Sequence, residues 1–172
     1  MVKFLLLALA LGVSCAHYQN LEVSPSEVDG KWYSLYIAAD NKEKVSEGGP
    51  LRAYIKNVEC IDECQTLKIT FYTKVEGVCQ EHTIVGRKGE DGKYITDFSG
   101  QNYFHIVEKS DDTMTFHNVN VDDSGKTNVI LVVGRGESSS IEQKQRFEKT
   151  AEEYDIPKEN IEDLVPTDNC DQ

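Results

Sequence analysis

Cysteine is the residue type whose spacing in this chain most restricts the possible chemistry. The sequence contains Cys15, Cys60, Cys64, Cys79 and Cys170. Thiols form disulfides in an oxidising compartment, or bind zinc where four Cys or His ligands come together. The spacing disfavours zinc, because no second Cys-x2-Cys or His pair completes four ligands around Cys60 and Cys64.

Histidines and asparagines on two neighbouring predicted strands are the other candidates for chemistry. His105 and His117 would face each other on the outer surface if the turn at Asp111 centres their hairpin, which would permit weak metal binding or a pH response. We expect instead two exposed histidines without partners. Asn102 and Asn118 are the polar side chains suited to orient a ligand oxygen by donating to it, or else they satisfy neighbouring backbone groups.

The first sixteen residues have the three parts of a secretory signal peptide. Lys3 supplies the positive region, residues 4–13 are apolar but too few to span a bilayer, and Ser14-Cys15-Ala16 is a small-residue cleavage site. We therefore predict a signal peptide over residues 1–16 and one secreted, extracellular domain over residues 17–172.

Removal of the leader leaves four cysteines, which can pair in three ways. We favour Cys60–Cys64, which closes a short loop between two strands, and Cys79–Cys170, which ties the C-terminal tail to the wall of the fold.

The charge balance is strongly acidic, with 18 basic and 30 acidic residues and a formal net charge of −12. Such a surface repels phosphate backbones and anionic lipids, so neither nucleic acid nor a membrane is an expected partner. We expect no cofactor either. Gly48-Gly49 lacks the lysine and the helix start of a phosphate-binding loop, and we interpret it as a flexible lid.

Apolar and polar residues alternate through the middle of the chain. Leu67, Ile69 and Phe71, for example, alternate with Lys68 and Thr70. The same period of two is present in residues 51–56, 67–72, 78–86, 93–98, 102–108, 113–119 and 127–134. With the strand that contains Trp32, short turns predict an all-β fold, an eight-stranded antiparallel up-and-down β-barrel whose interior could hold one small ligand.

Two helices are predicted outside the strands. Ser24-Pro25-Ser26-Glu27 has the pattern of a capping box that opens one short helical turn. Ser139 and Glu142 repeat that pattern before a C-terminal helix over residues 141–154. Ile141, Phe147, Ala151 and Tyr154 could form the stripe with which this helix packs on the outside of the barrel.

Two short motifs resemble the signatures of the lipocalin family. Gly30-Lys31-Trp32-Tyr33 is similar to the first signature, and Gly134-Arg135 to the third, in which the arginine packs over the tryptophan. The stretch Ala38-Ala39-Asp40-Asn41 and the ending Ile156-Pro157-Lys158-Glu159-Asn160-Ile161 resemble, within that family, the rodent-type odorant-binding proteins and their aphrodisin-like subgroup. The resemblance covers essentially the whole mature chain and supports the favoured disulfides.

From the residues alone a packed barrel and a hollow one both remain open. The resemblance implies a hollow barrel, and strand alternation aligned with the family's cavity positions gives an expected ligand-binding set. This set is Ile37, Leu51, Ala53, Ile55, Ile69, Phe71, Ile84, Phe98, Asn102, Phe104, Phe116, Asn118, Val129, Leu131 and Val133.

The function implied by the resemblance is that of a secreted carrier, in nasal mucus or a glandular secretion, for small hydrophobic odorants or pheromones. A homodimer or a heterodimer with a related lipocalin is also compatible with it. Two alternatives remain: a chemosignal whose own surface is read by a receptor, and an isomerase of the lipocalin type. The isomerase needs a free cysteine in the cavity, and no mature cysteine is expected to be free.

Overall fold

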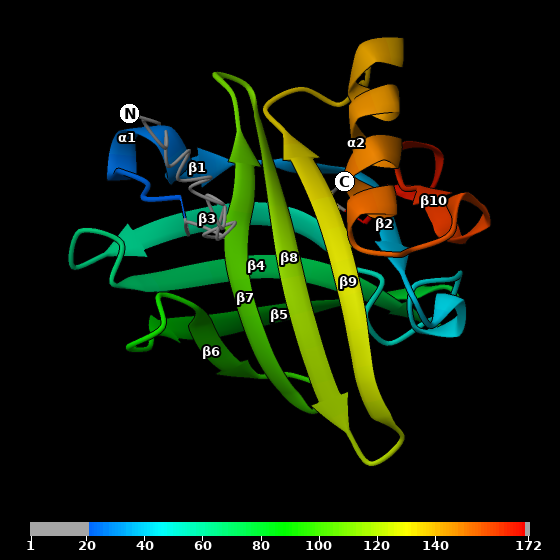
Figure 1. The fold of residues 1–172 in the computed structure, drawn as a ribbon, viewed down its shortest axis with the longest axis horizontal. Coiled ribbons are helices and arrows are strands. Elements are labelled where there is room, and N and C mark those ends of the chain that lie inside the picture. The colour runs from blue at the N-terminus through cyan, green and yellow to red at the C-terminus, as the bar shows by residue number, and fades with distance from the viewer. Residues whose placement is uncertain (1–20, 171–172) are drawn as a thin grey trace, which may run out of the picture.

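Residues 21–170 are described by a computed structural model of the chain, so the expected signal peptide at residues 1–16 lies outside them. Strands and short helices follow one another along this range, and a longer helix comes near its end (Figure 1). In chain order the elements are α1 (Pro25–Val28), β1 (Gly30–Lys31), β2 (Tyr33–Ala39), the 3-10 helix η1 (Lys42–Lys44), β3 (Tyr54–Ile61), β4 (Thr66–Val75), β5 (Val78–Lys88), β6 (Tyr94–Asp97), β7 (Gln101–Lys109), β8 (Thr113–Asp122), β9 (Gly125–Gly134), α2 (Ile141–Glu153), η2 (Lys158–Asn160), β10 (Ile161–Asp163) and η3 (Val165–Thr167).

The strands close into a barrel through the N-terminal strand. Strands β3 to β9 pair antiparallel with their neighbours in chain order, whereas β1 pairs with β3 and β2 pairs with β9. Because β1 and β2 are two parts of one strand interrupted at Trp32, this strand joins the two ends of the sheet. The described range thus confirms an eight-stranded antiparallel up-and-down barrel, to which β10 adds a short segment on the free edge of β2. In Figure 1, β7, β8 and β9 stand upright and cross β3, β4 and β5 behind them.

Alternation places one side of each strand inside the barrel. In β4, Leu67, Ile69, Phe71 and Thr73 are buried while Lys68 is exposed, as a period of two requires. The strand predicted from residue 51 begins later than its pattern suggested, since β3 starts at Tyr54. Leu51 and Ala53 end the preceding loop instead, because the Leu51 amide donates to the carbonyl of Lys44 and folds the chain back.

Trp32 plugs one end of the barrel, which we call the closed end. Its side chain is only 2% exposed, and its indole N–H donates to the Val28 carbonyl at 2.7 Å. The Arg135 guanidinium lies 3.7 Å from the centre of the indole ring and donates to the carbonyls of Lys31 and Glu27. Gly30 has a φ of 115°, and a Cβ there would lie 3.3 Å from Arg135 Nη1, so glycine suits both the backbone and the close approach.

The disulfides tie loops and tail to this frame. Cys60 is bonded to Cys64 across the turn between β3 and β4, and Cys79 on β5 is bonded to Cys170. Within residues 21–170, no group of three or more His, Cys, Asp or Glu side chains is placed to hold a metal ion.

Helix α2 packs on the outside of the barrel, beside β9 in Figure 1. Its buried Phe147 stacks on Tyr36 of β2 with ring centres 5.7 Å apart, and Ala151 is also buried. The predicted N-cap was one residue early: Ser140 caps the helix together with Gln143, because the Ser139 hydroxyl is bonded to Tyr36. Ile141 does not belong to the packing stripe, since it is 73% exposed.

His105 and His117 are opposite each other on the outer face of β7 and β8, with ring centres 5.5 Å apart. The expectation that they are exposed and unpaired was wrong. Both are buried, because Tyr154 at the end of α2 stacks on the His117 ring at 4.3 Å. Burial lowers the pKa of His117, and it lowers the pKa of His105 to about 4, with a smaller effect from the neighbouring His117.

We expect this buried pair to make the fold less stable in mild acid. An unfolded histidine takes up its proton near pH 6.5, whereas folded His105 stays neutral down to about pH 4, so the unfolded state binds more protons as the pH falls between these values. Above about pH 6.5, His105 therefore does not change the free energy of unfolding. As the pH falls below 6.5 this free energy decreases, by about 2 kcal/mol at pH 5. Urea unfolding of the chain and of His105→Phe at both pH values measures this. An equal fall in the two proteins would contradict the assignment to His105.

Candidate ligand-binding cavity

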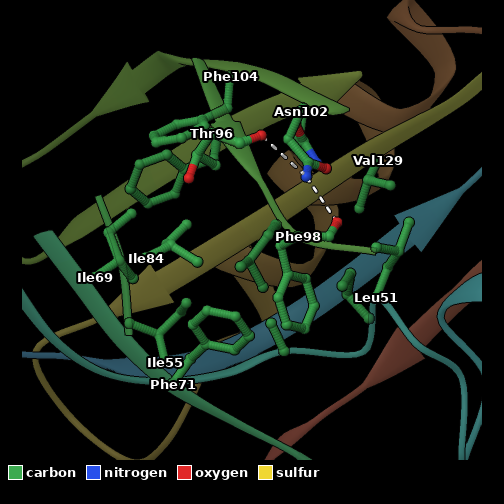
Figure 2. Close-up of a pocket in the computed structure, with 15 residues that line it drawn as sticks. Leu51, Ile55, Ile69, Phe71, Ile84, Thr96, Phe98, Asn102, Phe104 and Val129 are labelled. Atoms are coloured by element: carbon green, nitrogen blue, oxygen red, sulfur yellow. Dashed lines mark hydrogen bonds between the residues drawn. The ribbon is translucent and has the colours of Figure 1, made fainter. Parts of the chain in front are cut away.

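A cavity of about 110 Å³ lies inside the barrel, lined almost entirely by apolar side chains (Figure 2). Fourteen of the fifteen residues expected to bind a ligand line it. They are Ile37, Leu51, Ala53, Ile55, Ile69, Phe71, Ile84, Phe98, Asn102, Phe104, Phe116, Asn118, Val129 and Leu131. The structure therefore brings together residues from seven strands and from the loops before β3 and β7.

Val133 is the expected residue that does not line the cavity. It follows Leu131 on the same face of β9 but lies one inward position closer to the closed end, where it is fully buried in the core cluster that also contains Trp32. Thr96 on β6 lines the cavity although it was not expected to. Its alternation with Tyr94 and Phe98 on the inward face is the signal that could have identified it.

Aromatic rings crowd the end of the cavity opposite Trp32, which we call the open end. Phe98, in the turn between β6 and β7, meets Phe71 edge to face with ring centres 5.0 Å apart. His82 on β5 contacts both rings at 5.3 and 4.9 Å, and its Nε2 is bonded to the Thr73 hydroxyl at 2.8 Å. His82 was not singled out in the sequence, where no feature of β5 distinguishes it.

Three asparagines form a polar corner at one side of this apolar wall. Asn102 Nδ2 donates to the carbonyls of Phe98 at 2.8 Å and Thr96 at 3.5 Å, as Figure 2 shows. Asn102 Oδ1 accepts from the side-chain amides of Asn118 and Asn120, both at 3.0 Å. Asn102 thus satisfies neighbouring backbone and side-chain groups, so its amide is fully engaged.

Asn118 Oδ1 is the atom of this corner that suits a ligand. It belongs to a residue on the cavity wall, is shielded from solvent, and has no hydrogen-bond partner within residues 21–170. A buried carbonyl oxygen without a donor costs about 1–3 kcal/mol, which a ligand hydroxyl would recover. The structure reverses the expected polarity: the Asn118 amide nitrogen is occupied, and it is the oxygen that is free to accept.

The loop of residues 40–53 crosses the open end. Lys44 Nζ donates to the Asp122 carboxylate at 2.7 Å and so ties this loop to the turn between β8 and β9. This hydrogen bond, with others from Ser124, lowers the pKa of Asp122 to about 2. Gly48 and Gly49, which we expected to form a lid, lie within the loop, and a Cβ on Gly49 would meet the Lys44 carbonyl at 2.6 Å.

A barrel plugged at one end, with an apolar cavity and the unpaired Asn118 oxygen on the wall of that cavity, defines a class of binding proteins for one small, largely apolar molecule. The comparisons with known proteins identify the family. The model of the lipocalin / cytosolic fatty-acid binding protein family matches residues 29–168, and the chain belongs to that family.

Relatives and solved structures are similar over nearly the whole chain. The male-specific submandibular salivary gland protein of Mesocricetus auratus is 86% identical over 172 residues, which is 100% of both chains. The odorant-binding protein of Rattus norvegicus is 61% identical over the same full lengths. A solved structure of the odorant-binding protein OBP1 has a TM-score of 0.85 and 61% identity, covering 89% of this chain and 100% of the other. Bovine odorant-binding protein solved with undecanal has a TM-score of 0.62 and 31% identity, covering 90% and 99%.

Proposed function

We propose that this chain is a secreted carrier that binds small hydrophobic volatile molecules, odorants or pheromones, reversibly inside its barrel. The observation that carries the proposal is the cavity inside the barrel, whose wall is apolar apart from Thr96, Asn102 and Asn118. The names of the similar proteins support it, since three of those reported above are odorant-binding proteins and one of these was solved with an aldehyde, undecanal.

Apolar burial sets the expected strength and breadth of binding. Each buried methylene contributes about 0.8 kcal/mol, so a ligand of roughly ten carbons gains about 8 kcal/mol before the costs of association. Because a free energy of about 8 kcal/mol corresponds to a Kd of about 1 μM, micromolar affinity is the upper limit that apolar burial alone sets for such a ligand. Because apolar burial is non-directional, the carrier accepts many ligands of suitable size and shape.

We infer that the protein releases its ligands chemically unchanged. The isomerase alternative requires a free thiol in the cavity, whereas Cys60, Cys64, Cys79 and Cys170 are all in disulfides.

Secretion follows from the predicted signal peptide. None of the helices within residues 21–170 has the length and apolarity needed to cross a membrane. Assembly into a homodimer or a heterodimer with a related lipocalin remains part of the proposal.

The proposal is tested with purified protein from which bound lipid has been extracted. A fluorescent apolar probe is displaced by alcohols, aldehydes, terpenoids and hydrocarbons, and the mixtures are then separated by chromatography. We expect displacement at about micromolar concentration and recovery of every ligand unchanged. Absence of displacement by all classes would refute the carrier, and a product that forms only with intact protein would establish an enzyme.

Asn118→Leu should weaken the binding of alcohols and phenols while sparing hydrocarbons of the same size. The free Oδ1 accepts from a hydroxyl, and its loss removes a hydrogen bond worth about 1 kcal/mol, or roughly fivefold in affinity. Ketones and ethers carry no donor and should change as little as hydrocarbons do. Calorimetric titration of matched alcohol, ketone and hydrocarbon ligands measures the difference, and equal changes for all three would remove Asn118 from the site.

A further inference from the structure

Two stacked rings form the floor of the cavity on the side of the closed end. Phe104 on β7 lines the cavity, and Tyr94 on β6 lies against it with ring centres 5.3 Å apart and planes inclined by 21°. Tyr94 is held in place, because its hydroxyl donates to the Cys64 carbonyl within the loop closed by the Cys60–Cys64 disulfide. Both rings are buried.

Gly86 lies directly against this floor. It is the next inward position after Ile84 on β5, opposite Leu67 of β4, and it is buried. A Cβ built on Gly86 would lie 2.7 Å from Phe104 Cζ, 2.9 Å from Phe104 Cε1 and 3.1 Å from Tyr94 Cβ. Carbon atoms in folded proteins do not approach this closely, so the Phe104 ring occupies the space that any side chain at position 86 would fill.

Space, and not backbone freedom, is what requires glycine here. The φ of Gly86 is not among the positive values of the chain, and the residue pairs regularly within the sheet, so alanine fits its backbone. Glycine within a strand weakens it, because there is no side chain to pack, and such a glycine often marks a close approach. At Gly86 the approaching group is the phenyl ring that forms the cavity floor.

The direction in which Phe104 would yield follows from its neighbours. Tyr94 is fixed on one side by its hydrogen bond to the disulfide loop, and Phe116 meets Phe104 edge to face at 6.2 Å on another. The cavity is the remaining side and contains free volume. A side chain at position 86 would therefore push the ring into the cavity and raise its floor.

We propose that Gly86 is a specificity-determining residue, which sets the depth of the cavity and thereby the length of ligand that the barrel accepts. This inference rests on the proposed carrier function and adds to it the ligand class: extended aliphatic molecules whose chain ends on the Phe104 ring. Gly86 acts through Phe104 and not by contact with the ligand, because the missing side chain lets the Phe104 ring pack close to β5.

The test measures affinity against ligand length in three variants and the wild type. Hexanol, octanol and decanol are titrated by calorimetry into the full mature chain. Gly86→Ala should weaken decanol about tenfold more than hexanol, because the chain loses contact over one or two methylenes, each worth roughly fourfold in affinity. Gly136→Ala is the matched control, since a Cβ there meets nothing within 4 Å, and it should leave all three affinities unchanged.

A second variant separates the raised floor from general damage to the barrel. Gly86→Ala/Phe104→Leu replaces the obstructing ring by a shorter side chain, and should restore decanol binding to within about threefold of the wild type. If Gly86→Ala alone does not fold but the double variant does, the steric conflict is established in the same way. Failure of both to fold would overturn the inference.

The remaining outcomes distinguish a failure of the role of Gly86 from a failure of the carrier function. A loss of affinity in Gly86→Ala that is independent of chain length, or no loss at all, would overturn the role of Gly86 while leaving the carrier function standing. Failure of the wild type to bind any of the three alcohols would instead refute the carrier function and this inference together.

Discussion

Trp32→Ala should lower the free energy of unfolding by about 3–5 kcal/mol. The substitution empties the plug of the closed end, where the indole is almost fully buried and donates to the Val28 carbonyl. It also removes the ring beneath the Arg135 guanidinium, whose stacking on the indole contributes about 1 kcal/mol. Urea unfolding followed by circular dichroism measures the loss.

Arg135→Ala and Val78→Ala are the controls for this prediction. Arg135→Ala should lower the free energy of unfolding less, by about 1–2 kcal/mol. The double variant with Trp32→Ala should lose less than the sum of the two single variants, because the two side chains contact each other. Val78 is 63% exposed, so Val78→Ala should change stability by about 0.5 kcal/mol or less. A loss below 1 kcal/mol in Trp32→Ala would contradict the plug as a source of stability.

Removal of the Cys79–Cys170 disulfide should cost about 4–5 kcal/mol, because the bond closes a loop with a sequence separation of 91 residues and so restricts the unfolded chain. The Cys60–Cys64 bond spans a separation of 4 residues and should contribute only about 2 kcal/mol by the same reasoning. Denaturation of the two double-alanine variants, Cys79→Ala/Cys170→Ala and Cys60→Ala/Cys64→Ala, compares them directly. Equal losses would show that chain entropy does not govern their contributions.

Side-chain contacts of the tail provide an independent measure of its anchoring. Thr167 is bonded to Tyr54 at 2.8 Å and accepts from Arg52 at 3.2 Å, and its carbonyl accepts from Lys74. These contacts hold the tail near β3 and β4 without the covalent bond. The variant that lacks Cys79–Cys170 will have a lower melting temperature than the wild type. Well below that temperature, we expect it to keep the barrel and its ligand affinity.

The sequence by itself was sufficient to predict most of the residues that line the cavity. Period-two alternation through residues such as Ile69, Phe71 and Phe116 is a local property of an extended chain, so it determines which side chains share a face, and the resemblance to the lipocalin family assigned that face to the cavity. The similarity of Gly30-Lys31-Trp32 and Gly134-Arg135 to family signatures likewise placed the plug.

Tertiary structure alone decided the properties that depend on atoms from distant segments. His105 and His117 are buried because the end of α2 covers their strands, which no pattern on those strands reveals. The atom of the Asn118 side chain that has no hydrogen-bond partner is its oxygen, because its amide nitrogen donates to Asn102 Oδ1 on another strand. The depth of the cavity depends on the ring of Phe104 lying against Gly86, eighteen positions away in the sequence. Alternation determines which face of a strand a residue occupies, whereas packing between strands determines how much room and which polar atoms remain there.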